Sequence, residues 1–181
     1  MVKSYKSVIK AIEAAPEDVQ WYYTPIVNLI ADYAYGVPLA YAFSQLERGQ
    51  RNALYCGMRK IHGVHSDIAW KAIRSEHLTR KLYRERFKDV LAKNIPHSMI
   101  EDIEIAEKTR DTYMHGRNPN DADMRTAIVA VIHYSEGMNR LCELAHGFRP
   151  YGNLKGFAGA GTSLNVDTSR LVAKGLGFSL G

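Results

Sequence analysis

Residues 121–146, DADMRTAIVAVIHYSEGMNRLCELAH, decide the fold that the sequence predicts. Apolar and small side chains recur in this stretch at intervals of three and four, which is the periodicity of an α-helix with one buried face. The residues of that face are Met124, Ile128, Val131, Ile132, Ser135, Met138, Cys142 and Ala145. The face is wide and continuous, so other helices must cover it.

The same periodicity, with proline and capping signals between the stretches, continues toward the N-terminus. Helices are predicted over residues 16–23, 25–36, 39–63, 67–93 and 96–116. The connections are short and no stretch reads convincingly as a strand. The sequence therefore predicts an all-α fold, an antiparallel bundle of four to five helices.

Composition changes at Gly147, because the last 35 residues hold eight of the fourteen glycines and little helical periodicity. We therefore divide the chain into a helical bundle over residues 1–147 and a Gly-rich C-terminal arm or tail over residues 148–181. The sequence leaves open whether this tail docks on the bundle, reaches a partner subunit or stays flexible. Residues 171–178 are its candidate anchor.

Composition also predicts the compartment. The chain of 181 residues has no apolar run near the roughly 20 residues that cross a bilayer. Its first residues lack the apolar core and cleavage site of a secretory signal. Cys56 and Cys142 lie apart in apolar helical stretches and read as buried, reduced side chains. We expect a soluble, cytoplasmic protein without membrane contact.

The net charge of +5 is unevenly distributed. Residues 61–100 hold eight Lys or Arg against four acids, whereas residues 101–150 hold six against nine. Four cations on one side of the predicted helix over 67–93 form a candidate RNA-binding surface. They are Lys71, Arg74, Lys81 and Lys88. A solvated helix face is the commoner explanation of such a run, and that alternative stays open.

Arg110 is the most unexpected residue of the helix predicted before residue 116. At about 100° of rotation per residue it falls about 20° from Ile103, within the stripe that faces the core. A guanidinium in such a position needs partners. We expect it to point into a polar cleft, onto a carboxylate or toward a subunit interface.

Asp111 precedes His115 by four residues, the spacing at which side chains meet on one helix surface. The carboxylate is therefore expected to orient the imidazole and to favour its protonated form. Arg110 and His115 differ by about 140° of rotation, so they do not share a face as metal ligands would. They would converge if the helix frays at Gly116 or if a second chain supplies the partner.

The segment Arg110-Asp111-Thr112-Tyr113-Met114-His115-Gly116 resembles the Arg, polar, three variable residues, His motif of HEPN domains. These domains are small helical bundles of prokaryotic toxins and defence proteins. The resemblance covers roughly residues 20–147, and it includes the long amphipathic helix after the motif. It implies a dimer in which two motifs face each other across a shared cleft, and RNA cleavage without a metal ion or other cofactor.

The resemblance also implies a role for each side chain. Arg110 would bind the scissile phosphate, His115 would move the proton, and Asp111 would hold the histidine. Arg117 and Asn118, in the loop that follows, would steady the RNA backbone. Some toxins of this type carry a tyrosine at the position of Arg117, where a partner antitoxin modifies it, so an antitoxin of this chain would act in another way.

Other patterns compete for a functional role. His62, His65 and Asp67 could ligate a metal, but no Glu-x-x-His pair accompanies them, and we expect turn residues. The sequence GFAGAGTS over 156–163 resembles a phosphate-binding loop without its lysine, and we expect a docking tail instead. The aromatic residues 21–23 are assigned to packing.

We therefore predict a dimeric, metal-independent endoribonuclease with Arg110, Asp111 and His115 as catalytic residues. The alternative is a non-catalytic bundle of the same kind that binds RNA or a protein partner. A third class is a structural protein that assembles through the Gly-rich tail.

Overall fold

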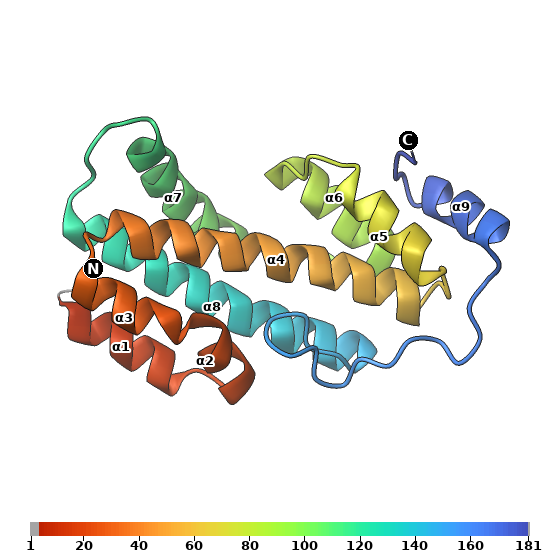
Figure 1. Ribbon diagram of the computed structural model, residues 1–181, viewed down its shortest axis with the longest axis horizontal. Helices are drawn as coiled ribbons and strands as arrows, with labels where there is room; N and C mark the ends of the chain where they lie inside the picture. Colours follow the sequence, from red (N-terminus) through yellow and green to blue (C-terminus); the bar gives the residue numbers. More distant parts are fainter. Residues whose placement is uncertain (1–3, 181) are drawn as a thin grey trace.

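The computed structural model describes residues 4–180, which form α-helices and connecting segments and contain no strand. The all-α bundle is therefore confirmed for this part of the chain (Figure 1). Its helices are α1 (Tyr5–Ala14), α2 (Glu17–Tyr23), α3 (Pro25–Asp32), α4 (Gly36–Lys60), α5 (Ser66–Arg74), α6 (Arg80–Leu91), α7 (His97–Met114), α8 (Asp121–His146) and α9 (Val166–Gly175).

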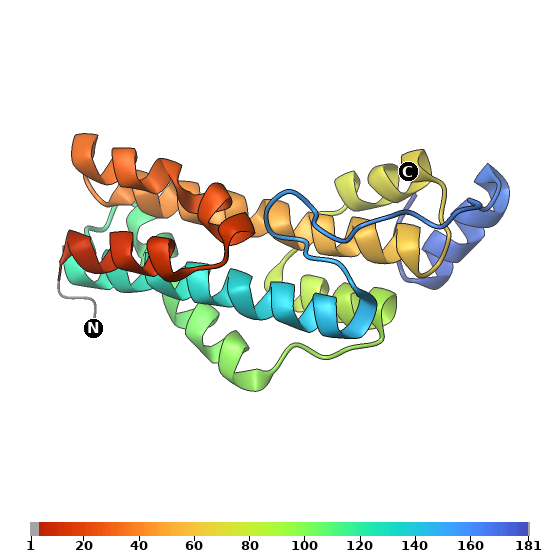
Figure 2. The same cartoon turned by 90° about the horizontal axis from the view of Figure 1, so that it is seen from below.

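The two longest helices, α4 and α8, lie side by side and form the spine of the molecule (Figures 1 and 2). They run in the same direction. Arg125, near the start of α8, lies over the ring of Tyr35, which precedes α4. At the other end, Lys60 donates to the carbonyl of Gly147, just after α8. In the sequence, α5, α6 and α7 connect the end of α4 to the start of α8. Helix α7 packs against α8 and runs in the opposite direction.

The prediction of a single helix over residues 67–93 is wrong, because the structure has two helices there, α5 and α6. Ser75 ends α5, and its hydroxyl donates to the carbonyls of Ala72 and Ser179. Thr79 begins α6, where its hydroxyl accepts from the amide of Leu82. Such local hydrogen bonds of Ser and Thr compete with a continuous helix. The run of basic residues is thus spread over two helices.

Helix α1 was not predicted. It packs against α8 and buries Val8 and Ile12 completely or nearly so. Tyr5, Val8, Ile9 and Ile12 recur at helical spacing, so the sequence did contain a signal for this helix, and the prediction missed it.

The C-terminal segment docks on the bundle. Phe148 and Tyr151 are fully buried in the same hydrophobic core as α4 and α8. Helix α9 packs against α5, where Ala173 and Phe178 are buried (Figure 1). The expected anchor over 171–178 agrees with this contact. The boundary drawn at residue 147 does not divide the core, since residues on both sides of it share one interior.

Asn139 joins three parts of that interior. Its amide nitrogen donates to the Asp18 carboxylate at 3.0 Å and to the Tyr151 carbonyl at 2.8 Å, and its oxygen accepts from the Tyr151 amide at 2.8 Å. All three groups are buried, so each bond replaces one that water would otherwise make. Asn139 thus fixes both the N-terminal helices and the C-terminal segment on α8.

No helix in residues 4–180 is long and apolar enough to cross a membrane. Cys56 and Cys142 are free and buried, as the sequence predicted. Burial raises the pKa of each thiol to about 12.

Candidate functional site

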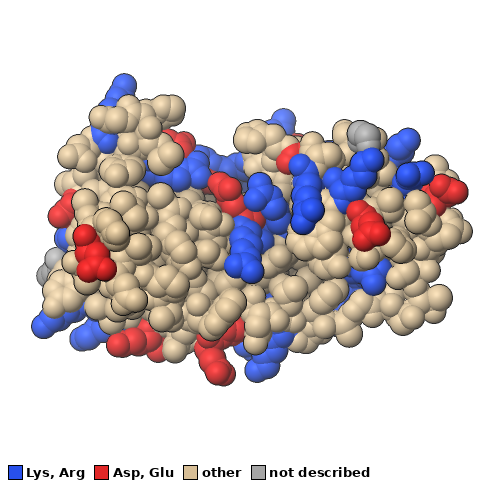
Figure 3. Space-filling view, in the orientation of Figure 1, with Lys and Arg blue, Asp and Glu red and all other residues tan. Residues whose placement is uncertain are grey.

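A groove of about 460 Å³ opens between α4, the connection from α5 to α6, the first turns of α6, and α7. Lys and Arg side chains gather where the surface is hollowed between α7 and α6 (Figure 3). The charged residues that line the groove are Arg80, Lys81, Arg84, Arg110, Glu47, Glu104 and Glu107. The groove therefore carries both signs of charge, with the cations in a small excess.

Arg110 lies on the wall of this groove, on the side formed by α7. Its guanidinium stacks over the Phe43 ring of α4, 4.7 Å from the ring centre. Its Nε and Nη2 donate to Oδ1 of Asp111 at 3.0 and 2.7 Å, and its Nη1 lies 3.6 Å from Oε1 of Glu47. The expectation that this arginine faces inward and meets a carboxylate is thus confirmed. The N–H groups of Nη1 form no hydrogen bond among residues 4–180, and the Arg110 side chain as a whole is 25% exposed.

Asp111 does not orient His115 in this structure. Its Oδ1 accepts from Arg110, and its Oδ2 lies 3.8 Å from Nη2 of Arg80. His115 follows the last residue of α7, where the backbone leaves helical geometry, and its side chain is exposed. Two guanidinium groups compete for the carboxylate, although the backbone amide of His115 still donates to the Asp111 carbonyl at 3.0 Å. The expected pairing is therefore absent from the described part of the chain.

The other predicted RNA-binding residues lie in different places. Lys81 lines the groove, whereas Lys71, Arg74 and Lys88 do not. Arg74 instead stacks on the Trp70 ring, 5.3 Å from its centre. The remaining two predicted RNA-binding residues, Arg117 and Asn118, are exposed in the loop between α7 and α8.

The residues of the two ion pairs that join α6 to α7 in the groove were not among the predicted site residues. Arg84 of α6 donates from Nη1 to Oε1 of Glu104 of α7 at 3.1 Å, and Arg80 forms an ion pair with Glu107. The spacing held a signal, because Arg80 and Arg84 are four residues apart and Glu104 and Glu107 are three apart. Each pair shares one helix face. Which helix faces which is long-range information that the spacing alone does not contain.

The groups that competed for a metal or phosphate role have structural partners. His62 donates from Nε2 to the Val90 carbonyl at 2.8 Å, and His65 caps α5. No group of three or more potential metal-ligating His, Cys, Asp or Glu side chains occurs among the described residues. In the segment 156–163, Ser163 accepts from Nη1 of Arg59 at 2.8 Å, so this loop docks on the end of α4.

Comparison with known proteins adds no family. No protein-family model, curated protein or solved structure matches this chain significantly. The resemblance to HEPN domains therefore stays a prediction that rests on the motif from Arg110 to His115 and on the helices around it.

Proposed function

We propose that the chain binds RNA in the groove and cleaves it without a metal ion, as a HEPN-like endoribonuclease. The observation that carries the proposal is the state of Arg110. The contacts with Phe43 and Asp111 hold its guanidinium in one place at the open groove. Its Nη1 lies 3.6 Å from Oε1 of Glu47, an ion pair without a hydrogen bond among residues 4–180. A planar, permanently charged donor group held in this way suits the oxygens of a phosphodiester.

The chemistry would proceed by internal transfer. His115 takes the proton of the 2′-hydroxyl, the 2′-oxygen bonds to phosphorus, and the bond from phosphorus to the 5′-oxygen breaks. The leaving oxygen takes up a proton from an imidazolium, and the products are a 2′,3′-cyclic phosphate and a 5′-hydroxyl. Arg110 stabilises the negative charge that builds on the phosphate oxygens.

A homodimer forms part of the proposal because His115 is not among the residues that line the groove. His115 and the neighbouring Met114, whose side chain is 64% exposed, lie at the surface. We propose that His115 of one copy acts on RNA held by Arg110 of the other. Exposed apolar side chains near the motif, such as Met114, would be covered in that contact.

Cleavage of labelled single-stranded RNA in EDTA tests the proposal. We expect wild type to cut and His115→Ala to lose at least about 100-fold in rate, because general acid–base catalysis contributes about 10²- to 10⁴-fold. His97→Ala is the matched control, since His97 is an exposed histidine on the same helix and its ion pair within residues 4–180 is with the exposed Glu101. Equal cutting by wild type and His115→Ala would refute the assigned chemistry.

A second candidate function is RNA binding without cleavage. The position of Asp111 favours it, because this carboxylate is bound to Arg110 and lies near Arg80, so within residues 4–180 it does not orient the imidazole of His115. This function predicts salt-sensitive RNA binding, no products, and no effect of His115→Ala on affinity. A protein partner, such as an antitoxin, would then use the same groove.

A further inference from the structure

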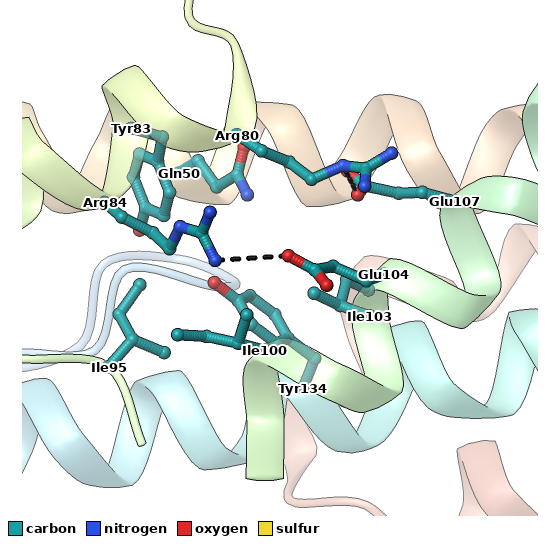
Figure 4. A pocket seen from close by; sticks show the side chains of 10 residues that line it. All are labelled: Gln50, Arg80, Tyr83, Arg84, Ile95, Ile100, Ile103, Glu104, Glu107 and Tyr134. Carbon is teal, nitrogen blue, oxygen red and sulfur yellow. Dashed lines mark hydrogen bonds and ion pairs between the residues drawn. The ribbon is translucent and has the colours of Figure 1, made fainter. Parts of the chain in front are cut away.

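A small chamber lies beside the groove and shares part of its wall. Its volume is about 20 Å³, room for about one water molecule. Three isoleucines, at 95, 100 and 103, give it an apolar side, and the rings of Tyr83 and Tyr134 complete it (Figure 4). Tyr83 is 2% exposed, and its buried hydroxyl has no hydrogen-bond partner among residues 4–180.

Two ion pairs separate the chamber from the groove. Arg84 and Arg80 reach from α6 toward α7, where they meet Glu104 and Glu107 (Figure 4). All four residues line both the groove and the chamber. Glu107 is 7% exposed, so its carboxylate is held at the bottom of the groove rather than at its rim. The wall thus presents donor and acceptor groups side by side.

A phosphate alone is a poor ligand for this wall. It would satisfy a guanidinium, but it would displace the carboxylate from its partner and place a second negative charge beside it. A buried carboxylate without a donor is costly. A ligand that fits must offer acceptors to the arginine and donors to the glutamate at the same time.

Guanine has this pattern. Its O6 and N7 are two acceptors, which an arginine binds with both arms. Its N1–H and N2–H groups are two neighbouring donors, which fit the two oxygens of a carboxylate. Adenine, cytosine and uracil lack this combination of two adjacent acceptors on one edge and two adjacent donors on the next. The amide of Gln50, which lines both spaces, adds one more donor and acceptor.

We propose that the groove is specific for a guanine base of the bound RNA, read by Arg84 and Glu104, with Arg80 and Glu107 behind them. This inference rests on the proposed function, since it assumes that RNA enters the groove. The groove volume of about 460 Å³ lies within the range of about 300–1,000 Å³ for small-ligand sites. Leu78, which is half-buried, supplies apolar surface for one face of the base, whereas Phe43 and Leu46 lie almost fully buried beneath the groove.

Fluorescence anisotropy with four labelled oligouridylates tests the specificity. They are equal in length and differ at one central position, which is G, A, C or U. We expect the G oligomer to bind about tenfold more tightly than the other three, the discrimination of a good bidentate contact. Glu104→Gln should abolish this preference, because its amide group sets a donor against the donors of guanine; the measured quantity is the ratio of the G and U affinities within each variant.

Glu101→Gln is the matched control, since Glu101 lies three residues earlier on α7 and its partner is the exposed His97. It should keep the preference for G. Circular dichroism checks that both variants are folded. Equal affinity for all four oligomers overturns the guanine assignment and leaves RNA binding in place. A G preference that survives in Glu104→Gln also overturns the assignment. Failure to bind any oligomer overturns the proposed function together with this inference.

Discussion

Replacing Arg110 by lysine separates charge from geometry at the proposed phosphate site. Lysine keeps the positive charge but loses the planar fork, the two bonds to Asp111 and the stacking on Phe43. Exposed cation–π contacts contribute about 0.5–1 kcal/mol, and ion pairs near the surface about 0.2–1 kcal/mol. Since lysine retains part of each, we expect a loss of about 1 kcal/mol in folding free energy, or about 2–4 °C in Tm.

The effect on cleavage should be much larger. A hydrogen-bond donor that is fixed where negative charge develops in the transition state contributes about 10²- to 10³-fold to the rate of cleavage. The flexible ammonium group of lysine does not replace such a donor. We therefore expect Arg110→Lys to cut RNA in EDTA at least about 100-fold more slowly, while a thermal melt stays within a few degrees of wild type. Arg170→Lys on α9, where Arg170 pairs with Asp167, is the control for the exchange itself.

Salt titration of RNA binding completes the test. For single strands, log K falls with log salt concentration by about 0.7 for each neutralised phosphate. Arg110→Lys should keep the slope of wild type, and Arg110→Ala should reduce it by about 0.7. Cleavage by Arg110→Lys within about threefold of wild type would refute the role of the fork. An unchanged slope in Arg110→Ala would show that no phosphate binds at this residue.

Four further outcomes concern the fold. Asn139→Ala should lower the free energy of unfolding in urea by about 3 kcal/mol, because it leaves buried donors and acceptors unpaired; a loss below about 1 kcal/mol would contradict this. Deletion of residues 148–181 should abolish cooperative unfolding rather than only oligomer formation, because Phe148 belongs to the core; a truncated chain that melts like the full one would refute this. Cys56 and Cys142 should resist thiol reagents until urea unfolds the chain. Their pKa is raised from 9.0 to about 12, so the unfolded state ionises first, and stability should fall as pH rises from about 9 toward 12, measured by urea melts.

Local signals predicted the helices that are amphipathic and long. The stripe on residues 121–146 gives the bounds of α8, and Asn120 caps that helix by accepting from the amide of Asp123. The division of the stretch 67–93 was missed because its interruption contains neither glycine nor proline. It depends on Ser75 and Thr79, and Ser75 also bonds to the distant carbonyl of Ser179. A hydrogen bond between residues so far apart in the sequence leaves no signal in a stretch of a few neighbouring residues.

The candidate site was predictable to the extent that it depends on one helix. The phase of α7 placed Arg110 on an inward face, and the structure places its guanidinium over Phe43. The partners across the groove were not predictable, because the pairing of Arg84 with Glu104 depends on how α6 lies against α7. The Asp111–His115 pairing failed for a related reason, since Arg80 arrives from another helix and competes for the carboxylate.

The same long-range pairing changes what the charge count means. The excess of cations in residues 61–100 suggests a basic surface, yet Arg80 and Arg84 meet glutamates of the acidic helix, and Arg86 is paired with the buried Glu76. The four cations of the groove, Arg80, Lys81, Arg84 and Arg110, each have a carboxylate partner, so a phosphate backbone that binds there competes with that partner. A polyanion gains little from such pairs, whereas a base that bonds to both members of a pair keeps each of them satisfied. The affinity for RNA should therefore depend less on salt, and more on base identity, than the net charge of +5 suggests.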